Sequence, residues 1–518
     1  MKPLKILFAT LLFITITKAQ TSLRNLLEGY GAPGSKDALG SGIIGLGDIN
    51  NDGWDDFAVS ASGLRKTYIY FGGPGILDAI PDVAIKGGGT MVMGDLNGDG
   101  KKDLAIWLSG YSFGGIDTVL VYLGKQPSPI GLDTIPSLIL SGENVEDQFG
   151  ATMAIGDLNK DGYDDLVISA RYFNYSNGKV YIYMGKKLLG NLPDFTALGD
   201  TTISGYGYII QIADVSGDGV DDLVISSPDR RQESTLLDIF YGRKGFSFTQ
   251  NAFNHRLDSR NIINGAYLYL ARLVDVNCDG IDDLYFSHPQ GKEGYAFLGR
   301  KDSMRWTPDL IYPNPDPTFF TRMSPYACDI GDFNGDGIED YILTASIGAP
   351  CALVYIGKSN QPTKPYGVRA VVGLQYIAGV GDVNGDGADD FGMTAPTDAL
   401  DRGYFVILSG EKGVSEVSNE KNVFNENYSL QQNFPNPFNP MTTIEYSLSR
   451  RNQVSLIIYD TLGKEVRKLV NQIQNEGNYR VLWDGRDAQG NHVSSGVYYY
   501  KLILGSRTEI SKKAIHLR

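Results

Sequence analysis

One nine-residue pattern, Asp-x-(Asn/Ser)-x-Asp-Gly-x-x-Asp, occurs seven times between Asp48 and Asp390. Successive copies begin 47, 62, 57, 61, 57 and 50 residues apart. This spacing is long enough for a four-stranded unit and too regular for scattered metal sites. The repetition therefore predicts an all-β ring of seven blades.

The oxygen-bearing positions of each copy suit a hard cation. Side chains at positions 1, 3 and 5 can converge if the chain curls, and the glycine at position 6 permits the sharp turn. The carbonyl of position 7 and the carboxylate of position 9 would complete a shell that fits calcium best. The predicted calcium ligands, with position 7 acting through its carbonyl, are Asp48, Asn50, Asp52, Trp54 and Asp56; Asp95, Asn97, Asp99, Lys101 and Asp103; Asp157, Asn159, Asp161, Tyr163 and Asp165; Asp214, Ser216, Asp218, Val220 and Asp222; Asp275, Asn277, Asp279, Ile281 and Asp283; Asp332, Asn334, Asp336, Ile338 and Asp340; Asp382, Asn384, Asp386, Ala388 and Asp390.

The residues after each loop exclude an EF-hand, which needs a bidentate Glu at position 12 and flanking helices. Position 12 is apolar in every copy: Val59, Ile106, Ile168, Ile225, Phe286, Leu343 and Met393. Apolar runs such as 165–169 instead predict a strand buried on both faces. A second strand such as 180–185 follows a turn, so each loop is expected to join strands of a hairpin.

A solvated turn is the simpler explanation of any single acidic, glycine-rich loop. Seven copies with oxygens at fixed positions favour metal binding for the set, with one or two sites allowed to be empty. The second copy is the weakest, because Lys101 and Lys102 place positive charge beside the ion.

These residues resemble the FG-GAP repeats of the integrin α-subunit β-propeller. The third repeat, 149–157, is most similar, since a Phe-Gly pair opens it; the corresponding pairs at 39–40 and 206–207 are Leu-Gly and Tyr-Gly. The resemblance spans about residues 22–410 and implies a seven-bladed propeller with calcium in hairpin loops at one rim. Integrin α-subunits carry such loops only in some blades, so seven copies are closer to bacterial relatives of the family.

The ring is expected to close through the start of the chain. Repeats are expected to end in a short fourth strand, for which 137–142 and 201–205 are the candidates. The last repeat has no clear fourth strand after 404–409, whereas 24–29 offers one. Pairing that segment into the last blade would remove two exposed sheet edges.

The formal net charge of −14 is explained mostly by the loops. Positions 1, 5 and 9 supply 21 acids and position 8 supplies six more, so 27 of the 60 acidic residues lie in the loops. Seven calcium ions would carry a charge of +14. The acidity therefore indicates metal binding and argues against a nucleic-acid partner. The acids at position 8 are Asp55, Asp164, Asp221, Asp282, Glu339 and Asp389.

The first 19 residues are typical of a secretory signal peptide. Lys2 and Lys5 precede an apolar stretch, 6–16, and cleavage is expected after Ala19. A membrane anchor would need about 20 apolar residues, and no later stretch is long enough to cross a bilayer. The mature chain is therefore expected to be exported, without a transmembrane span.

Composition changes after the repeats. Residues 20–410 are assigned to the propeller and the polar, aperiodic residues 411–427 to a linker. Residues 428–518 are expected to form a small Ig-like β-sandwich. Its candidate strands are 443–448, 453–460, 477–484 and 496–502.

This tail resembles the type A C-terminal sorting domain of the type IX secretion system of Bacteroidota-like bacteria. The matching residues are the Asn-Pro-rich entry 434–440, Tyr-Asp-Thr-Leu-Gly at 459–463, Trp-Asp-Gly at 483–485, Ser-Gly-Val-Tyr at 495–498 and the terminal 512–517. The resemblance implies export by the type IX machinery of a Gram-negative bacterium, to the outer-membrane surface or the medium. The alternative is a plain Ig-like adhesive module.

Short motifs that resemble catalytic or nucleotide-binding sequences occur, but their predicted secondary structure is not the one that those functions require. Gly-x-Ser-x-Gly at 110–114 lies between two short strands, whereas a hydrolase elbow joins a strand to a helix. The dinucleotide-like glycines of 40–45 lead into a metal loop, and His288 is expected at a blade-edge turn. We therefore favour a noncatalytic calcium-binding module for adhesion to a glycan or protein ligand. The alternative is a secreted hydrolase or lyase with its site on a propeller face.

Overall fold

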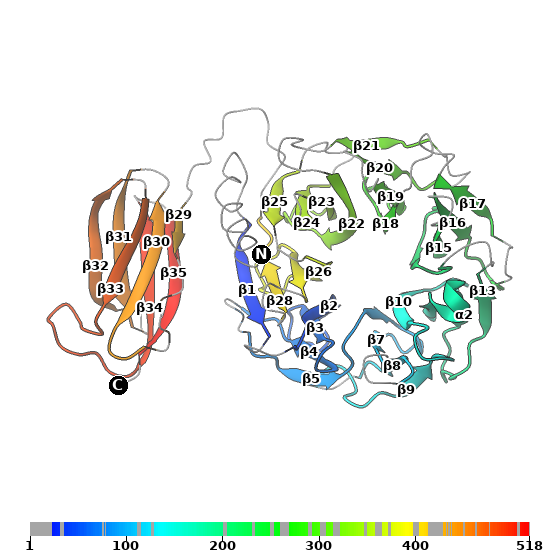
Figure 1. The fold of residues 1–518 in the computed structure, drawn as a ribbon, viewed down its shortest axis with the longest axis horizontal. Helices are drawn as coiled ribbons and strands as arrows, with labels where there is room; N and C mark the ends of the chain where they lie inside the picture. Colours follow the sequence, from blue (N-terminus) through cyan, green and yellow to red (C-terminus); the bar gives the residue numbers. More distant parts are fainter. Residues whose placement is uncertain are drawn as a thin grey trace. The chain divides into compact units, whose positions relative to one another are not determined.

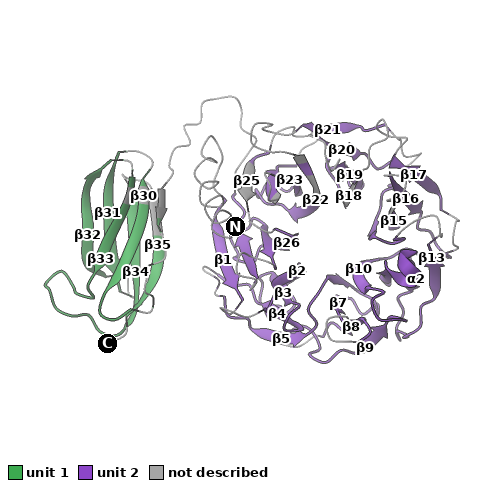
Figure 2. Cartoon of the chain, viewed as in Figure 1, with its two compact units in different colours: residues 1–19, 420–518 green, residues 20–419 purple. Residues whose placement is uncertain are grey.

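The computed structural model describes residues 23–31, 36–74, 77, 79–110, 115–125, 129–199, 205–229, 234–248, 253–259, 269–287, 293–300, 307–313, 322–346, 350–357, 365–370, 374–396, 403–412, 428–430, 433, 436, 438–448, 451–460, 464–475, 477–504 and 508–516. Two compact units are present, one over residues 20–419 and one whose described residues lie within 428–516 (Figure 2). The expected signal peptide, most of the expected linker and His288 lie outside the described residues.

The first unit has a propeller-like fold, in which the described residues form seven four-stranded antiparallel sheets around a centre (Figure 1). Blades 1 to 3 contain β2 (Leu39–Gly47), β3 (Asp56–Ala61), β4 (Lys66–Tyr70) and β5 (Val83–Lys86); β6 (Met91–Gly94), β7 (Asp103–Leu108), β8 (Thr118–Tyr122) and β9 (Leu138–Ser141); β10 (Phe149–Gly156), β11 (Asp165–Ala170), β12 (Lys179–Tyr183) and β13 (Phe195–Leu198). A short turn labelled α2 (Phe173–Ser176) lies between β11 and β12, and Asn174 and Tyr175 within it do not have right-handed helical backbone angles.

The same order continues around the ring. Blades 4 to 6 contain β14 (Ile209–Ala213), β15 (Asp222–Asp229), β16 (Ser234–Phe240) and β17 (His255–Asp258); β18 (Tyr269–Val274), β19 (Asp283–Ser287), β20 (Glu293–Phe297) and β21 (Leu310–Pro313); β22 (Arg322–Gly331), β23 (Asp340–Ser346), β24 (Pro350–Tyr355) and β25 (Gly367–Ala370). Blade 7 contains β26 (Tyr376–Gly381), β27 (Asp390–Ala395), β28 (Tyr404–Leu408) and, from the start of the chain, β1 (Asn25–Tyr30). First strands such as β2 and β22 lie nearest the centre, and fourth strands such as β5 and β21 lie outermost (Figure 1).

The strand after each loop is the most deeply buried, as its unbroken apolar run predicts. The seven position-12 side chains are all at most 1% exposed. Each such strand has a neighbouring strand on both edges, and adjacent blades cover its two faces. Alternation between core and solvent is therefore absent, because neither face meets water.

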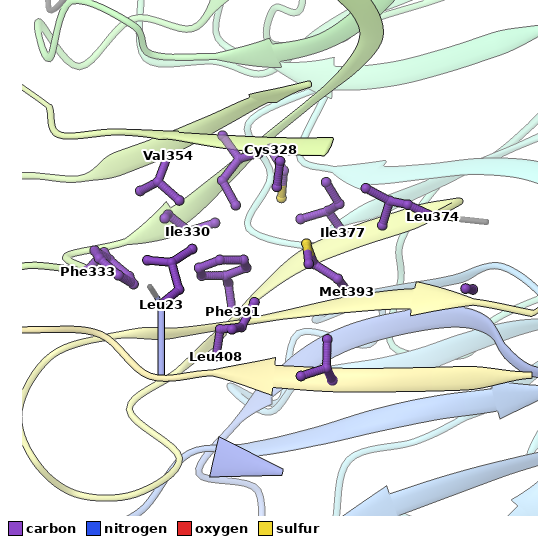
Figure 3. Close-up of a cluster of buried hydrophobic side chains, with 14 of the residues drawn as sticks. Leu23, Cys328, Ile330, Phe333, Val354, Leu374, Ile377, Phe391, Met393 and Leu408 are labelled. Atoms are coloured by element: carbon purple, nitrogen blue, oxygen red, sulfur yellow. The ribbon is translucent and has the colours of Figure 1, made fainter. Parts of the chain in front are cut away.

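One apolar cluster fills the space between each pair of adjacent blades, seven in all among the described residues. Between blades 6 and 7, Phe333 and Val354 pack near Phe391 and Leu408 (Figure 3). Leu23, just before β1, joins the same cluster and is 4% exposed. Burying one leucine side chain contributes about 1.5–3 kcal/mol, so these clusters supply much of the stability of the ring.

The expected closure through the N-terminal segment is confirmed. Strand β1 pairs antiparallel with β28, with Leu27 opposite Ile407 and Tyr30 opposite Tyr404. Leu27 is 6% exposed and belongs to the apolar cluster between blades 7 and 1. The first strand of the chain thereby covers the outer edge of the last blade.

The expected fourth strand at 137–142 is confirmed as β9, but the one at 201–205 is wrong. Strand β13 pairs with β12 and is the fourth strand of blade 3. It lies several residues earlier in the chain than expected, and 201–204 are outside the described residues. The glycines of 40–45 lie within β2 and precede no helix, as expected, and most of 110–114 is not described.

The second unit is a two-sheet sandwich. One sheet has the order β29 (Tyr428–Leu430), β30 (Thr442–Leu448), β33 (Gly477–Trp483), and the other β32 (Glu465–Gln474), β31 (Asn452–Tyr459), β34 (Gly496–Leu504), β35 (Thr508–His516). The four expected strands are found, and β29, β32 and β35 were not anticipated. In the part of the chain that the structure describes, no helix has the length and apolar character needed to span a membrane.

Candidate metal-binding loops

The seven acidic loops occupy equivalent places. Each joins the first strand of a blade to the second, and its position-9 aspartate pairs in register with the residue just before position 1. In blade 3 this pair is Gly156 and Asp165. Because the register is the same in every blade, all seven loops lie at the same ends of their strands and define one rim, called here the loop rim.

The carboxylate at position 1 organises each loop. In blade 3, Asp157 Oδ1 accepts from the amide of Asp161 at 3.1 Å and Asp157 Oδ2 from the amide of Gly162 at 2.9 Å. The bond from the position-6 glycine to the position-1 carboxylate recurs in all seven loops at 2.7–2.9 Å. Every position-6 glycine has a positive φ, between 79° and 95°. The requirement for glycine at the turn is thus met in each copy.

The carboxylate at position 9 is fully buried in all seven loops. Asp165 Oδ1 accepts from the amide of Gly185, after the third strand, at 2.8 Å, and its Oδ2 accepts from the amide of Leu158 at 3.1 Å. Burial, together with the smaller effect of the charges of Asp161 and Asp157, raises the pKa of Asp165 to about 7. The same causes raise the pKa of the other six position-9 carboxyls to about 6 to 8.

A cation would relieve this accumulation of charge. An opposite charge within a few ångströms favours the ionised form of each carboxyl, and carboxylate oxygens keep lone pairs beyond those used by the amides. At position 3 of the third loop, the buried Asn159 Oδ1 has no hydrogen-bond partner in the structure. An orphaned oxygen beside buried carboxylates fits a hard cation.

In several loops the side chains at positions 3 and 5 form a hydrogen bond with each other, and their oxygens do not converge on a single point where an ion would lie. The side-chain amides of Asn50, Asn277 and Asn334 donate to the position-5 carboxylates at 2.9–3.1 Å, and Asn384 Nδ2 donates to Asp390. Among the described residues, no group of three carboxylate, thiol or imidazole side chains converges as a metal centre. The structure therefore shows the loop fold and the buried acids, and the bound ion remains a prediction.

The second loop differs from the others in its charge. Lys101 Nζ lies 3.8 Å from Asp99 Oδ2. Lys102 occupies position 8, where six loops have an acid. A lysine ammonium so close to a candidate ligand would compete with a metal ion, which agrees with the expectation that this copy is the weakest.

The position-8 acids have a contact that the sequence did not indicate. Four of them accept a hydrogen bond from the position-1 amide of the adjacent blade's loop at 2.7–3.0 Å. These cross-blade hydrogen bonds join Asp95 to Asp164, Asp157 to Asp221, Asp332 to Asp389 and Asp382 to Asp55. The last of them connects blade 7 to blade 1.

A glycine precedes position 1 wherever this bond forms. A Cβ atom added at Gly94, Gly156, Gly331 or Gly381 would lie 2.1–2.5 Å from an oxygen of the neighbouring blade's position-8 acid. Only a residue without a side chain admits the carboxylate there. A glycine before position 1, combined with an acid at position 8, is the sequence signal that could have revealed the contact.

Family models match three segments of the chain. Residues 149–183 match the FG-GAP repeat, residues 48–106 match an FG-GAP-like repeat, and residues 441–504 match the FlgD Ig-like domain. The first two contain complete candidate loops, and the third covers most of the sandwich.

Curated relatives are similar to parts of the chain. A rat phosphatidylinositol-glycan-specific phospholipase D is 37% identical over 112 residues, which are 20% of this chain and 13% of that protein. Integrin alpha-5 of Xenopus laevis is 26% identical over 230 residues, 40% of this chain and 21% of the relative. Integrin alpha-PS3 of Drosophila melanogaster is 26% identical over 244 residues, which are 44% of this chain and 21% of the relative. The chain thus spans about a fifth or less of the length of each of these relatives.

The ring of four-stranded sheets and these matches define the class. The chain contains segments that match FG-GAP repeats, and part of it is similar to integrin α chains. Its propeller-like unit is followed by a unit similar to the FlgD Ig-like domain.

Proposed function

We propose that this chain is a noncatalytic ligand-binding or adhesion protein whose seven-bladed propeller is stiffened by calcium. The observation that carries the proposal is the sevenfold repetition of one loop in which a buried carboxylate lies near two further carboxylates. Up to seven ions would be bound, each through the predicted positions 1, 3, 5, 7 and 9 of one loop. Bound calcium would neutralise the buried acids, and the ligand would be an extracellular glycan or protein.

Calcium removal tests this proposal. A cation bound only by the folded state stabilises it, by about 2.7 kcal/mol per site at a hundredfold excess over the dissociation constant. The melting temperature of the purified chain should therefore fall strongly in EGTA and recover when calcium is restored, while magnesium at equal concentration restores less. A melting curve that EGTA leaves unchanged would contradict the calcium assignment for the whole set of loops.

We also propose export by the type IX secretion machinery, with the tail as the signal. The match to an Ig-like domain supports a sandwich there but does not separate a sorting domain from an adhesive module. Several residues of the sorting-domain resemblance meet in the sandwich core. Phe438 lies 5.1 Å from Trp483 and 4.8 Å from His516, and Trp483 lies 5.3 Å from Tyr498, between ring centroids. These side chains stabilise the fold, so the signal would be read from its surface.

A secreted hydrolase is the second candidate, because part of the chain is also similar to part of a phospholipase D. That match covers 20% of this chain and 13% of the relative. Assays with phosphodiester substrates and with polysaccharides, run on the calcium-loaded chain, separate the two functions. Turnover would favour the enzyme, whereas binding without turnover would favour the adhesion protein.

A further inference from the structure

The loop between β11 and β12, at the rim opposite the loop rim, has an unusual backbone. Asn174, Tyr175 and Ser176 follow one another with φ of 48°, 58° and 73°. Non-glycine residues rarely adopt the left-handed region, and three in succession are unfavourable unless surrounding structure enforces them. Such strain is concentrated at functional sites in proteins.

Hydrogen bonds from neighbouring segments fix this loop. The Tyr172 amide donates to the Asp147 carbonyl at 3.1 Å, and the Tyr206 amide donates to the Asn177 carbonyl at 3.0 Å. The first bond ties the loop to the segment that precedes β10, and the second ties it to the start of blade 4. The loop is therefore preorganised, which lowers the entropic cost of binding a ligand.

The strained turn projects an aromatic side chain into solvent. Tyr175 is 99% exposed, and Tyr172 is 38% exposed. Phe173 does not project in the same way, because its ring lies 4.9 Å from Lys179 Nζ. The rim therefore presents two tyrosine rings from one rigid segment.

Arg171, which precedes this turn, has no carboxylate partner among the residues that the structure describes. The Arg171 guanidinium carbon is 5.2 Å from the Tyr172 ring centroid and 5.1 Å from that of Tyr208, which begins blade 4. Its Nε donates to Gln148 Oε1 at 2.6 Å. By contrast, Arg256 of blade 4 is paired with Asp238. Over the ranges that the structure describes, Arg171 forms no ion pair, so the terminal nitrogens of its fork remain available to a ligand.

We propose that Arg171, Tyr172, Tyr175 and Tyr208, named here the blade 3 rim patch, bind an acidic polysaccharide through a uronate unit. A planar guanidinium held close to two aromatic rings is suited to bidentate recognition of a carboxylate. The apolar face of a sugar ring can lie on the exposed Tyr175 ring, and the nearby Asn174 and Ser176 offer polar groups to its hydroxyls.

A sugar ring that carries a carboxylate fits this set of one arginine, exposed tyrosine rings and small polar side chains better than a protein ligand does. A stable protein interface buries about 800 Å² on each partner around a largely apolar centre. The patch consists instead of one cationic fork, a few rings and small polar groups. This inference rests on the proposed ligand-binding function and specifies its site and ligand class.

Binding of polygalacturonate to the calcium-loaded chain tests the inference. Affinity for polygalacturonate should exceed that for fully methyl-esterified polygalacturonate and for dextran, since neither of these carries a carboxylate. Poly-glutamate provides carboxylates without sugar rings and should bind weakly. The salt dependence of binding reports the number of charges involved.

Variants locate the site. Arg171→Gln should weaken polygalacturonate binding about tenfold to a hundredfold, which corresponds to about 1.4–2.7 kcal/mol for a charge-assisted bond. Arg171→Lys keeps the charge but loses the fork, and should recover only part of the affinity. Tyr175→Ala should also weaken binding. Arg243→Gln makes the same charge change at an exposed arginine outside the patch and should bind as the parent does.

Each outcome is decisive once an unchanged melting temperature shows that the variants are folded. Equal binding of poly-glutamate would overturn the carbohydrate class, and absence of uronate binding by the parent chain would overturn the ligand. Uronate binding that Arg171→Gln leaves intact would overturn the site while leaving the ligand-binding function standing. If the parent binds no glycan or protein at all, the proposed function itself fails.

Discussion

The hydrogen bond between Asp55 and Asp382 connects the first and last blades, and its removal should weaken ring closure. Asp55 Oδ2 accepts from the Asp382 amide at 3.0 Å across 327 residues of sequence. Substitution Asp55→Ala leaves that amide without its acceptor, which costs about 1–3 kcal/mol for a buried donor. Because Asp55 is half-buried and water can partly replace it, we expect the lower part of this range.

Two further substitutions separate the hydrogen bond from the charge. Asp55→Asn keeps an oxygen acceptor of nearly the same shape and should cost less than about 1 kcal/mol. Gly381→Ala should be at least as harmful as Asp55→Ala, because its Cβ would lie 2.1 Å from Asp55 Oδ2 and its φ is 74°. Asp221→Ala, which removes the equivalent bond between blades 3 and 4, is the matched control for a contact within the ring.

The assay is urea unfolding at saturating calcium, followed by tyrosine and tryptophan fluorescence. Asp55→Ala and Asp221→Ala should lower the free energy of unfolding by similar amounts, and only the former should raise the population of species with an open ring in limited proteolysis. If Asp55→Asn is as damaging as Asp55→Ala, the contact acts through its charge and the hydrogen-bond argument is refuted.

Three other predictions follow from the loops and the chain ends. Asp161→Ala should reduce bound calcium by one ion of the full set, counted by elemental analysis, because the loops lie in different blades; loss of all calcium would contradict independent sites. Deletion of residues 22–30 should expose the edge of β28 and cause aggregation or a large loss of stability, detected by size-exclusion chromatography; a stable monomer would show that another segment covers this edge. Removal of residues 428–518 should leave a folded, calcium-binding propeller that accumulates in the periplasm of a host with type IX machinery, whereas normal export of the truncated protein would favour an adhesive module.

The strands that could be predicted are those whose burial requires a recognisable run of apolar residues in the sequence. Apolar runs after the loops, such as 165–169, are unbroken because two blades cover them, and all seven were placed correctly. Outer strands carry weaker patterns. Strand β13 has four residues, of which Ala197 is buried while Thr196 and Leu198 are exposed, so 201–205 appeared equally suitable. In the tail, β32 was missed because it is an edge strand with mostly exposed polar and charged residues.

The features of the candidate sites that the sequence did not predict are contacts between neighbouring repeats. The ligand positions could be identified because a loop of nine residues is a local structure with fixed chemistry. The cross-blade bond of Asp221 depends on how one blade packs beside the next, which a pattern within one repeat does not contain. The same holds for Arg171, whose neighbours Tyr208 and Gln148 come from separate segments.

The pairing of β1 with β28 makes closure of the ring depend on the last of the seven repeats. Leu27 and Ile407 are 380 residues apart, so the pairing cannot form until the last repeat is available. A growing or partly translocated polypeptide must therefore keep its first strand unpaired while six blades assemble behind it. A truncated chain that ends before Tyr404 lacks β28, so its last blade keeps an exposed sheet edge. Such a chain is open to proteolysis and aggregation. Ring closure thus reports that all seven repeats have been made.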